Sequence, residues 1–321
     1  MRTSLVTVFG GSGFLGRHTV RALAKAGWRI RVAVRYPNQA FFLLPNGHVG
    51  QIQIVKADVT DPEQISAAIA GADAVVNLTG ILFQSGHQTF EDVQAKAPGT
   101  VAEAARAHAV KTLVHVSAIG ADASSESRYA QSKAEGEAAL RNAFPDAVIL
   151  RPSIVFGPED DFFNRFAGMA RMMPALPLIG GGHTKFQPVF VGDVAEAISK
   201  SLDDVSARGR TYELGGPSIY SFRQLLEFIL RETGRKRLLV PLPFGLAKFK
   251  AFFLQMFPGP LKLTPDQVTL LKTDNVAHGA GLAELGIEAS SVEAEVPAYL
   301  WRFKPKGQYQ ALVSNAPAAP R

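Results

Sequence analysis

The sequence contains no cysteine among its 321 residues. A chain without cysteine has no disulfide framework, no thiolate metal site, no iron–sulfur cluster and no cysteine nucleophile. Charged residues are also sparse, at 19%, against about a quarter in ordinary soluble domains. A disordered or nucleic-acid-binding tail protein has the opposite composition. With 47% apolar residues, the chain has enough material for one large domain or one and a half around a substantial core.

Long hydrophobic runs are missing as well. No stretch of about 20 uninterrupted apolar residues occurs, so we expect no transmembrane helix. The first residues lead directly into an apolar run at 5–9, without the cleavage site of a signal peptide, so none is expected. The net charge is +6, from 34 basic and 28 acidic residues. This excess suits an anionic cofactor, an acidic membrane surface or an acidic partner, without deciding between them.

Short apolar runs alternate with helical segments along the first half of the chain. Predicted strands cover residues 5–9, 30–34, 52–55, 74–78, 112–116 and 147–150. Predicted helices cover residues 14–26, 62–70, 90–108 and 127–142. This alternation predicts right-handed βαβ units. The expected fold class is therefore α/β, a Rossmann-type doubly wound parallel sheet with a smaller α/β C-terminal lobe.

The second half is less regular, and glycines and prolines interrupt it. We expect strands at 186–190 and 212–214 and helices at 194–202 and 222–233, all in the lobe. The predicted domains are a nucleotide-binding core at 1–151, a lobe at 152–303 interleaved with the core, and a disordered tail at 304–321.

A glycine-rich turn follows the first predicted strand and precedes the first predicted helix. The turn has the spacing G-x-x-G-x-x-G and comprises Gly10, Gly11, Ser12, Gly13, Phe14, Leu15 and Gly16. Residues without a Cβ let backbone N–H groups approach a pyrophosphate, and the helix N-terminus adds partial positive charge. Because the strand–turn–helix context is the required one, the turn predicts dinucleotide binding at these residues rather than a plain connection.

The end of the second predicted strand carries Arg35. At this place an acidic side chain accepts a hydrogen bond from the ribose 2′-hydroxyl of NAD, whereas a guanidinium suits the 2′-phosphate of NADP. The sequence therefore predicts NADPH in preference to NAD. A solvated arginine at a strand end is the alternative interpretation.

Further cofactor contacts are expected after the third and fourth strands. Asp58 and Val59 are placed to lie along the adenine, while Asp61 is expected to cap the following helix. The fourth strand ends in residues expected beneath the cofactor, namely Asn77, Leu78, Thr79 and Gly80.

Tyr129 and Lys133 lie one turn apart on a predicted helix, so they share a face. An ammonium beside a phenol lowers the phenol's pKa and lets it act as a general acid or base. The lysine can also hold a ribose hydroxyl. Alone the pattern is weak, but it gains weight after five βα units and a phosphate-binding turn. The two residues are therefore candidate catalytic groups.

With these features the chain resembles the short-chain dehydrogenase/reductase superfamily, in its extended and atypical branch. The motifs that carry the resemblance lie at 10–16, 77–80, 115–117, 129–133, 151–158 and 188–195. The resemblance implies a Rossmann domain, a nicotinamide cofactor and a Tyr–Lys pair assisted by a hydroxyl side chain. It also adds Ser117, Pro152 and Ile154 to the expected cofactor contacts.

One departure concerns that hydroxyl. Catalytic extended members carry two or three hydroxyl residues after the fifth strand, whereas here Ser117 is followed by Ala-Ile-Gly-Ala. Within the branch, the chain is most similar to the nucleotide-binding accessory subunits of respiratory complex I and their bacterial counterparts. The shared motifs lie at 7–17, 77–82, 129–137, 151–157 and 186–194.

That resemblance implies a tightly held NADPH, a structural role without turnover, and other subunits of a respiratory complex as partners. It implies a peripheral location at the cytoplasmic face of a bacterial inner membrane. The Tyr129–Lys133 pair keeps an alternative open, a free-standing NADPH-dependent reductase or a sugar-nucleotide epimerase or dehydratase.

The segment 235–263 contains no acidic residue but carries six lysines and arginines and five phenylalanines. We expect it to make peripheral contact with a partner subunit or a membrane surface. The alternative is a helix packed on the core with a solvated basic edge. No RNA-binding pattern accompanies the segment, so nucleic acid is not expected. The seven histidines show no ligand spacing, so no metal is expected.

Overall fold

A computed structural model describes residues 4–256, 262–305 and 307. These residues divide into two compact units, and the chain passes between them repeatedly. The first unit takes in 1–153, 191–215 and 276–289, and the second takes in 154–190, 216–275 and 290–321. The first crossing thus falls two residues after the expected end of the core. Most of the expected tail at 304–321 lies outside the described residues.

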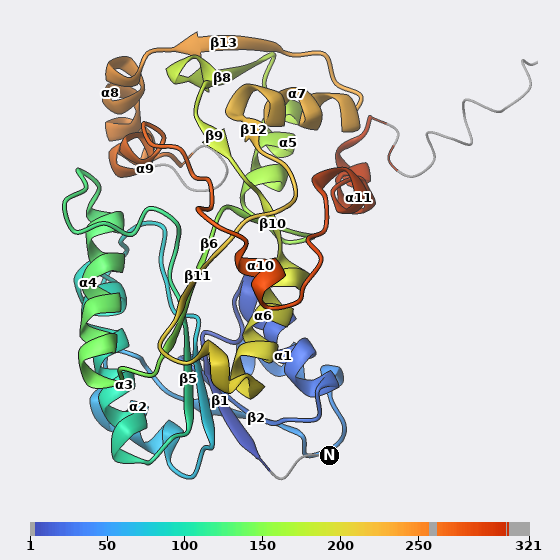
Figure 1. Cartoon of the computed structure of the whole chain (residues 1–321). Helices are drawn as coiled ribbons and strands as arrows, with labels where there is room; N and C mark the ends of the chain where they lie inside the picture. Colours follow the sequence, from blue (N-terminus) through green and yellow to red (C-terminus); the bar gives the residue numbers. More distant parts are fainter. Residues whose placement is uncertain (1–3, 257–261, 306, 308–321) are drawn as a thin grey trace, which may run out of the picture. The chain divides into compact units, whose positions relative to one another are not determined.

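Seven parallel strands form the sheet of the first unit (Figure 1). Their order in space is β11-β6-β5-β4-β1-β2-β3. The strands are β1 (Leu5–Phe9), β2 (Arg29–Val34), β3 (Ile52–Lys56), β4 (Ala74–Asn77), β5 (Thr112–Val116), β6 (Val148–Pro152) and β11 (Thr211–Leu214). The strand order reverses between β1 and β4, which is the topological switch point of a Rossmann sheet. The predicted fold class is confirmed.

Helices cover both faces of this sheet (Figure 1). On one face α1 (Phe14–Lys25) packs against α6 (Val191–Asp203), and on the other α3 (Ala97–Ala107) packs between α2 (Pro62–Ile69) and α4 (Arg128–Ala143). The central strands β4 and β5 are buried at every residue, as expected for parallel strands covered on both sides. Asp61 caps α2 as predicted, since its carboxylate accepts from the N–H groups of Glu63 and Gln64.

Three predicted elements of the first unit differ in the structure. The helix expected at 194–202 in the lobe is α6, which belongs to the first unit. The predicted helix at 90–108 is a π-helix at Glu91–Lys96 followed by α3. Pro98 has no N–H to donate to the carbonyl of Gln94, so a regular α-helical ladder cannot run through this point. Residues 212–214, expected in the lobe, instead form β11, the edge strand beside β6, because Tyr212 and Leu214 bury one face there.

The remaining described elements of the first unit are short, namely η1 (Pro37–Gln39), η2 (Phe41–Asn46), η5 (Val205–Ala207) and α10 (Gly281–Glu284).

In the described part of the second unit, the strands form three small two-stranded sheets. They pair β7 (Val155–Phe156) with β10 (Val189–Phe190), β9 (Lys185–Phe186) with β12 (Tyr220–Ser221), and β8 (Ala175–Ile179) with β13 (Leu238–Leu242). The strand predicted at 186–190 is therefore two short strands, because Pro188 lies between them and cannot donate to a ladder.

Helices complete the second unit. They are α5 (Phe162–Met172), α7 (Phe222–Glu232), α8 (Phe244–Leu254), α9 (Pro265–Leu270), α11 (Val292–Glu295) and α12 (Pro297–Leu300), with 3-10 turns η4 (Gly180–Gly182) and η7 (Trp301–Phe303). Its core is rich in aromatic rings, including Phe156, Phe163 and Phe222. In the part of the chain that the structure describes, no helix combines the length and the apolar character needed to cross a bilayer.

Candidate functional site

The glycine-rich turn lies at the carboxyl end of β1, at the switch point of the sheet. Gly10 has a φ of +75°, in the left-handed region that favours glycine. The N–H of Gly13 donates to the carbonyl of Gly10 at 3.1 Å and closes the turn. Gly13 is also the N-cap of α1 and supplies no side-chain acceptor to the first helical turn. The N–H groups of that turn are therefore suited to an external anion, which the helix dipole also favours.

The glycines of this turn serve two different purposes. A Cβ on Gly16 would lie 2.2 Å from the carbonyl oxygen of Gly10, so this glycine is required by packing between the helix and the turn. A Cβ on Gly13 would meet only that same oxygen, at 3.3 Å. Gly13 is exposed, and Ser12, Phe14 and Leu15 around it are half-buried. The open space at Gly13 fits the close approach of a pyrophosphate.

The end of β4 contacts this turn directly. A Cβ on Gly10 would lie 3.1–3.3 Å from backbone atoms of Leu78 and Thr79. The Asn77 side-chain oxygen accepts from the Thr79 N–H at 3.1 Å and from its hydroxyl at 2.6 Å. The structure thus brings together the predicted residues of the turn and of the fourth strand.

Lys133 is the buried cation of the site. Its side chain is 5% exposed, and its Nζ donates to the carbonyl of Val116 at 3.5 Å. A Cβ on Gly80 would lie 3.2 Å from this Nζ, so the glycine leaves the ammonium room at the end of β4. Burial lowers the pKa of Lys133 to about 8, although the carboxylate of Glu137 opposes the shift. Tyr129 lies half-buried one turn earlier on α4, as predicted.

Glu137 links the lysine helix to the sheet. Arg151 at the end of β6 donates to both oxygens of Glu137, at 2.9 and 2.6 Å. The same guanidinium lies 3.7 Å from Glu213 on β11. A bidentate pair of this kind has a defined geometry in addition to its charge attraction, so it fixes the position of α4 against β6.

Three buried polar atoms near the carboxyl ends of β4 and β5 have no hydrogen-bond partner among the described residues. They are Asn77 Nδ2, His115 Nδ1 and Ser117 Oγ. Buried polar atoms without partners are rare in proteins and are commonly satisfied by a ligand or an ordered water. Together with the open cradle at Gly13, these atoms fit a polar ligand that lies over the switch point.

Two further polar residues lie in this region. The sequence assigns no role at the site to His115, which belongs to the motif at 115–117, and it does not single out Gln94. His115 is paired with Asn77 in the β4–β5 register. Burial and the nearby Lys133 lower its pKa to about 3, so the imidazole is neutral at pH 7. Gln94, on the π-helix, accepts from the Ile81 N–H at 2.8 Å and donates to Ser132 on α4 at 3.1 Å. Gln94 therefore ties the loop after β4 to the helix of Tyr129 and Lys133.

Of the expected adenosine contacts, Arg35 is exposed and Asp58 and Val59 are half-buried. The Arg35 guanidinium lies 5.8 Å from the centre of the Tyr36 ring. One carboxylate oxygen of Asp58 accepts from the N–H and the hydroxyl of Thr60, while Val59 packs against the core of the first unit. An arginine that follows the glycine turn, Arg17, stacks on Phe42 at 4.9 Å.

The two remaining predicted residues lie in different units. Pro152 ends β6, where its carbonyl accepts from the Ile119 N–H at 3.0 Å. Ile154 belongs to the second unit, where its N–H donates to Asn275 at 3.0 Å.

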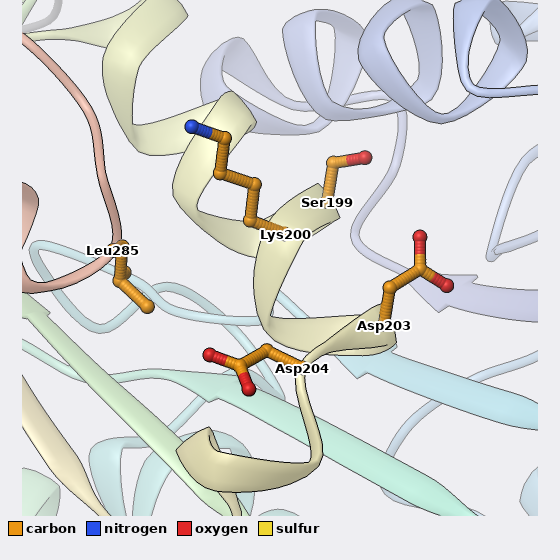
Figure 2. Close-up of a pocket in the computed structure, with 5 residues that line it drawn as sticks. All are labelled: Ser199, Lys200, Asp203, Asp204 and Leu285. Carbon is orange, nitrogen blue, oxygen red and sulfur yellow. The ribbon is translucent and has the colours of Figure 1, made fainter.

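A shallow pocket of about 330 Å³ lies elsewhere in the first unit, at the end of α6 (Figure 2). It is lined by Ser199, Lys200, Asp203, Asp204 and Leu285. Because α6 leads into a parallel strand, its C-terminal end lies at the amino edge of the sheet, opposite to the glycine turn. Lys200 already donates to the Gly286 carbonyl at 2.8 Å. Within residues 4–256, 262–305 and 307, no group of three or more His, Asp or Glu is arranged to hold a metal.

The sheet order, the glycine turn at the switch point and the Tyr–Lys helix define a Rossmann protein of the short-chain dehydrogenase/reductase type. The model of the NAD dependent epimerase/dehydratase family matches residues 6–215. A mitochondrial protein of Arabidopsis thaliana, NADH dehydrogenase [ubiquinone] 1 alpha subcomplex subunit 9, is 39% identical over 292 residues, which cover 87% of this chain and 72% of the relative. The chain therefore belongs to the NAD dependent epimerase/dehydratase family and, within it, is related to the NADH dehydrogenase [ubiquinone] 1 alpha subcomplex subunit 9 proteins.

Solved structures share the fold at lower identity. The Streptomyces venezuelae dTDP-glucose 4,6-dehydratase DesIV with NAD and TYD bound has a TM-score of 0.73 at 21% identity, and the match covers 96% of this chain and 99% of that structure. The Escherichia coli NADPH-dependent quinone oxidoreductase QOR2 with NADPH bound has a TM-score of 0.72 at 22% identity, covering 92% and 99%. Since one neighbour holds NAD and the other NADPH, the fold alone does not select the dinucleotide.

Proposed function

We propose that the chain is an NADP(H)-binding accessory subunit of a membrane-bound NADH:quinone oxidoreductase, with a structural or assembly role and no turnover of its own. Its place would be peripheral, among other subunits of the complex at the cytoplasmic face of a bacterial inner membrane. The name of the Arabidopsis relative supports membership of such a complex. The observation that carries the proposal is the glycine turn at the switch point, open at Gly13, together with a β5 end at which residues 118–121 carry no hydroxyl.

The residues present fit NADP(H), which in a reductase supplies a hydride. The N–H groups at the start of α1 would hold the pyrophosphate, and Arg35 would meet the 2′-phosphate. Lys133 would donate to the hydroxyls of the nicotinamide ribose. The unpartnered atoms of Asn77 and Ser117 are further groups that the dinucleotide or its bound water would satisfy.

The absence of turnover rests on the end of β5. A carbonyl reductase of this class needs a hydroxyl that polarises the substrate beside the tyrosine. Ser117 is buried, and its N–H is bonded to Leu150 within the sheet at 2.8 Å. Residues 118–121 carry no hydroxyl. The scarcity of hydroxyl groups directly after β5 therefore supports a role without turnover.

A second candidate function is an independent NADPH-dependent reductase or a sugar-nucleotide epimerase or dehydratase. The observation that favours it is the intact pair on α4, in which Lys133 is buried and has its pKa lowered to about 8. A lysine of this kind can support proton transfer by a neighbouring tyrosine.

The test compares the wild type with Tyr129→Phe in the organism that carries the gene. Quinone reductase activity of the membranes and the NADPH content of the purified chain are measured together. The structural role predicts that both stay nearly unchanged. Turnover of NADPH with a carbonyl or sugar-nucleotide substrate by the purified wild type, lost in Tyr129→Phe, would establish the enzyme instead.

A further inference from the structure

Helix α8 in the second unit exposes an unusual number of apolar side chains. Phe249 is 65% exposed, Phe252 60%, Phe253 52% and Met256, just past the helix, 82%. The ring of Phe253 packs edge-on against those of Phe249 and Phe252, at 5.4 and 5.5 Å between centres. The aromatic rings thus form a cluster on the surface rather than in the core. An exposed apolar patch of this kind marks an interaction site.

The rest of α8 anchors it to the second unit. Ala247 and Ala251 are fully buried one turn apart, and the helix packs against α9. A Cβ on Gly180 would lie 2.3 Å from the ring of Phe244, so this ring covers the turn after β8. The buried and the aromatic faces are therefore separate, and the exposed rings are not needed for the packing of α8.

Two lysines border the aromatic face. Lys248 and Lys250 are the chain neighbours of Phe249, so at about 100° per residue they project to either side of it. Both are exposed. Among the described residues, neither ammonium forms an ion pair with a carboxylate. The outward face of α8 is thus an apolar stripe with a cation on each edge.

Two other basic residues of the segment 235–263 form hydrogen bonds within the second unit. Arg235 donates to the Phe303 carbonyl at 3.0 Å, and Arg237 donates to the Ala170 carbonyl at 2.8 Å. Both hold the second unit together. Residues 257–261 of the segment lie outside the described residues, so the surface is defined by α8 and Met256.

We propose that α8 docks on an anionic lipid surface, with Phe249, Phe252, Phe253 and Met256 inserted at the boundary between headgroups and acyl chains. Lys248 and Lys250 then reach the phosphate groups while their stems lie along the apolar zone. With 11 residues the helix is too short to span the bilayer, so it lies on the surface. The proposal goes beyond the dinucleotide site and requires neither bound NADP(H) nor a respiratory complex.

Composition favours lipid over a protein partner. Protein interfaces are enriched in Tyr, Trp, Phe, Met and Arg and depleted in Lys, so the exposed Phe and Met side chains suit either kind of partner. The charged residues of α8 are both lysines, with no arginine, and this favours a lipid surface. Its exposed face also offers few groups for hydrogen bonds with a partner chain. Paired lysines beside a phenylalanine stripe complement a negatively charged headgroup layer.

The test is co-sedimentation of the purified full chain with vesicles of equal parts phosphatidylglycerol and phosphatidylcholine, and with vesicles of phosphatidylcholine alone. The wild type should bind the anionic vesicles more tightly, and salt should weaken the binding. Each lysine near anionic headgroups contributes about fivefold in partitioning. Lys248→Glu with Lys250→Glu should therefore weaken binding by at least about 25-fold.

Two further variants make the result decisive. Phe249→Ser with Phe253→Ser should also abolish binding while leaving the thermal unfolding temperature nearly unchanged. Lys25→Glu with Lys56→Glu, two exposed lysines of the first unit, makes the same change in net charge and should bind like the wild type. Absence of wild-type binding, equal binding by the α8 variants, or equal loss in the control would each overturn the proposal.

Discussion

At the scale of single residues, we expect Gly13 to be needed for ligand binding and Gly16 for folding. Gly13 has a φ of −72° and a ψ of −179°, which valine adopts readily. Gly13→Val should keep the fold but fill the space of the pyrophosphate, lowering NADPH affinity by more than about a hundredfold, or about 2.7 kcal/mol. Gly16→Ala forces a Cβ against a backbone oxygen and should lower the free energy of unfolding by about 1–3 kcal/mol. Calorimetric binding and urea unfolding measure the two effects, and equal destabilisation by both variants would contradict the assignment.

Arg35 is the residue on which NADPH preference depends. Arg35→Asp should reverse the preference between NADPH and NADH, since charge-assisted contacts contribute about 1.5–3 kcal/mol. Arg29→Asp is the matched control, because Arg29 is exposed at the other end of the same strand. The control should keep the wild-type ratio of dissociation constants. Equal affinity of the wild type for both dinucleotides would refute the role of Arg35.

Lys133 gives the site a pH dependence. With a pKa of about 8 in the folded chain, its ammonium is present at pH 7 and lost by pH 9. NADPH affinity should fall across this range, because the donor to the ribose is lost. Stability should change in the opposite sense, since above pH 8 the unfolded chain binds the proton more tightly and the free energy of unfolding rises. Titration of NADPH fluorescence should show the midpoint near pH 8, and Lys133→Met should give a flat profile. An unchanged wild-type affinity between pH 7 and pH 9 would exclude this lysine as the donor.

At the scale of elements, the π-helix and α4 approach each other through Gly136. A Cβ at this position would lie 2.0 Å from the carbonyl oxygen of Gln94. Gly136→Ala should therefore lower the free energy of unfolding by about 1–3 kcal/mol. Gly168→Ala, in the helix α5, meets only one ring atom at 3.9 Å and should raise it by about 0.5–1 kcal/mol. An unchanged or raised free energy of unfolding for Gly136→Ala in urea would show that Gly136 is not a packing contact.

The same elements show how far sequence patterns predict local structure. The strands at 5–9 and 112–116 begin and end as predicted, because each is a short apolar run bounded by turn residues. The π-helix was not predicted, since the periodicity through 90–108 is helical throughout and only Pro98 signals a break. The strand β11 was assigned to the lobe because its pairing with β6 depends on long-range contacts.

At the scale of the whole molecule, the sequence predicts those parts of the site whose residues lie close together along the chain. The glycine turn and the Tyr129–Lys133 pair each occupy a few consecutive positions, so their geometry follows from one turn or one helix. Gln94 and His115 were missed because their roles depend on tertiary contacts. Gln94 reaches Ser132, 38 positions away, and His115 faces Asn77 only through the strand register. The sequence predicts a lobe interleaved with the core, but the residues at which the chain passes between the two units have no local signal.

The central claim, an accessory subunit that holds NADP(H), is tested most directly by native electrophoresis of solubilised membranes, with NADPH measured in the band that contains the chain. The account predicts that the wild type migrates with a large NADH:quinone oxidoreductase and carries NADPH. Gly13→Val should lose both the NADPH and the high-mass band. Migration of the wild type on its own, at the mass of a free protein with no respiratory complex, would contradict the account.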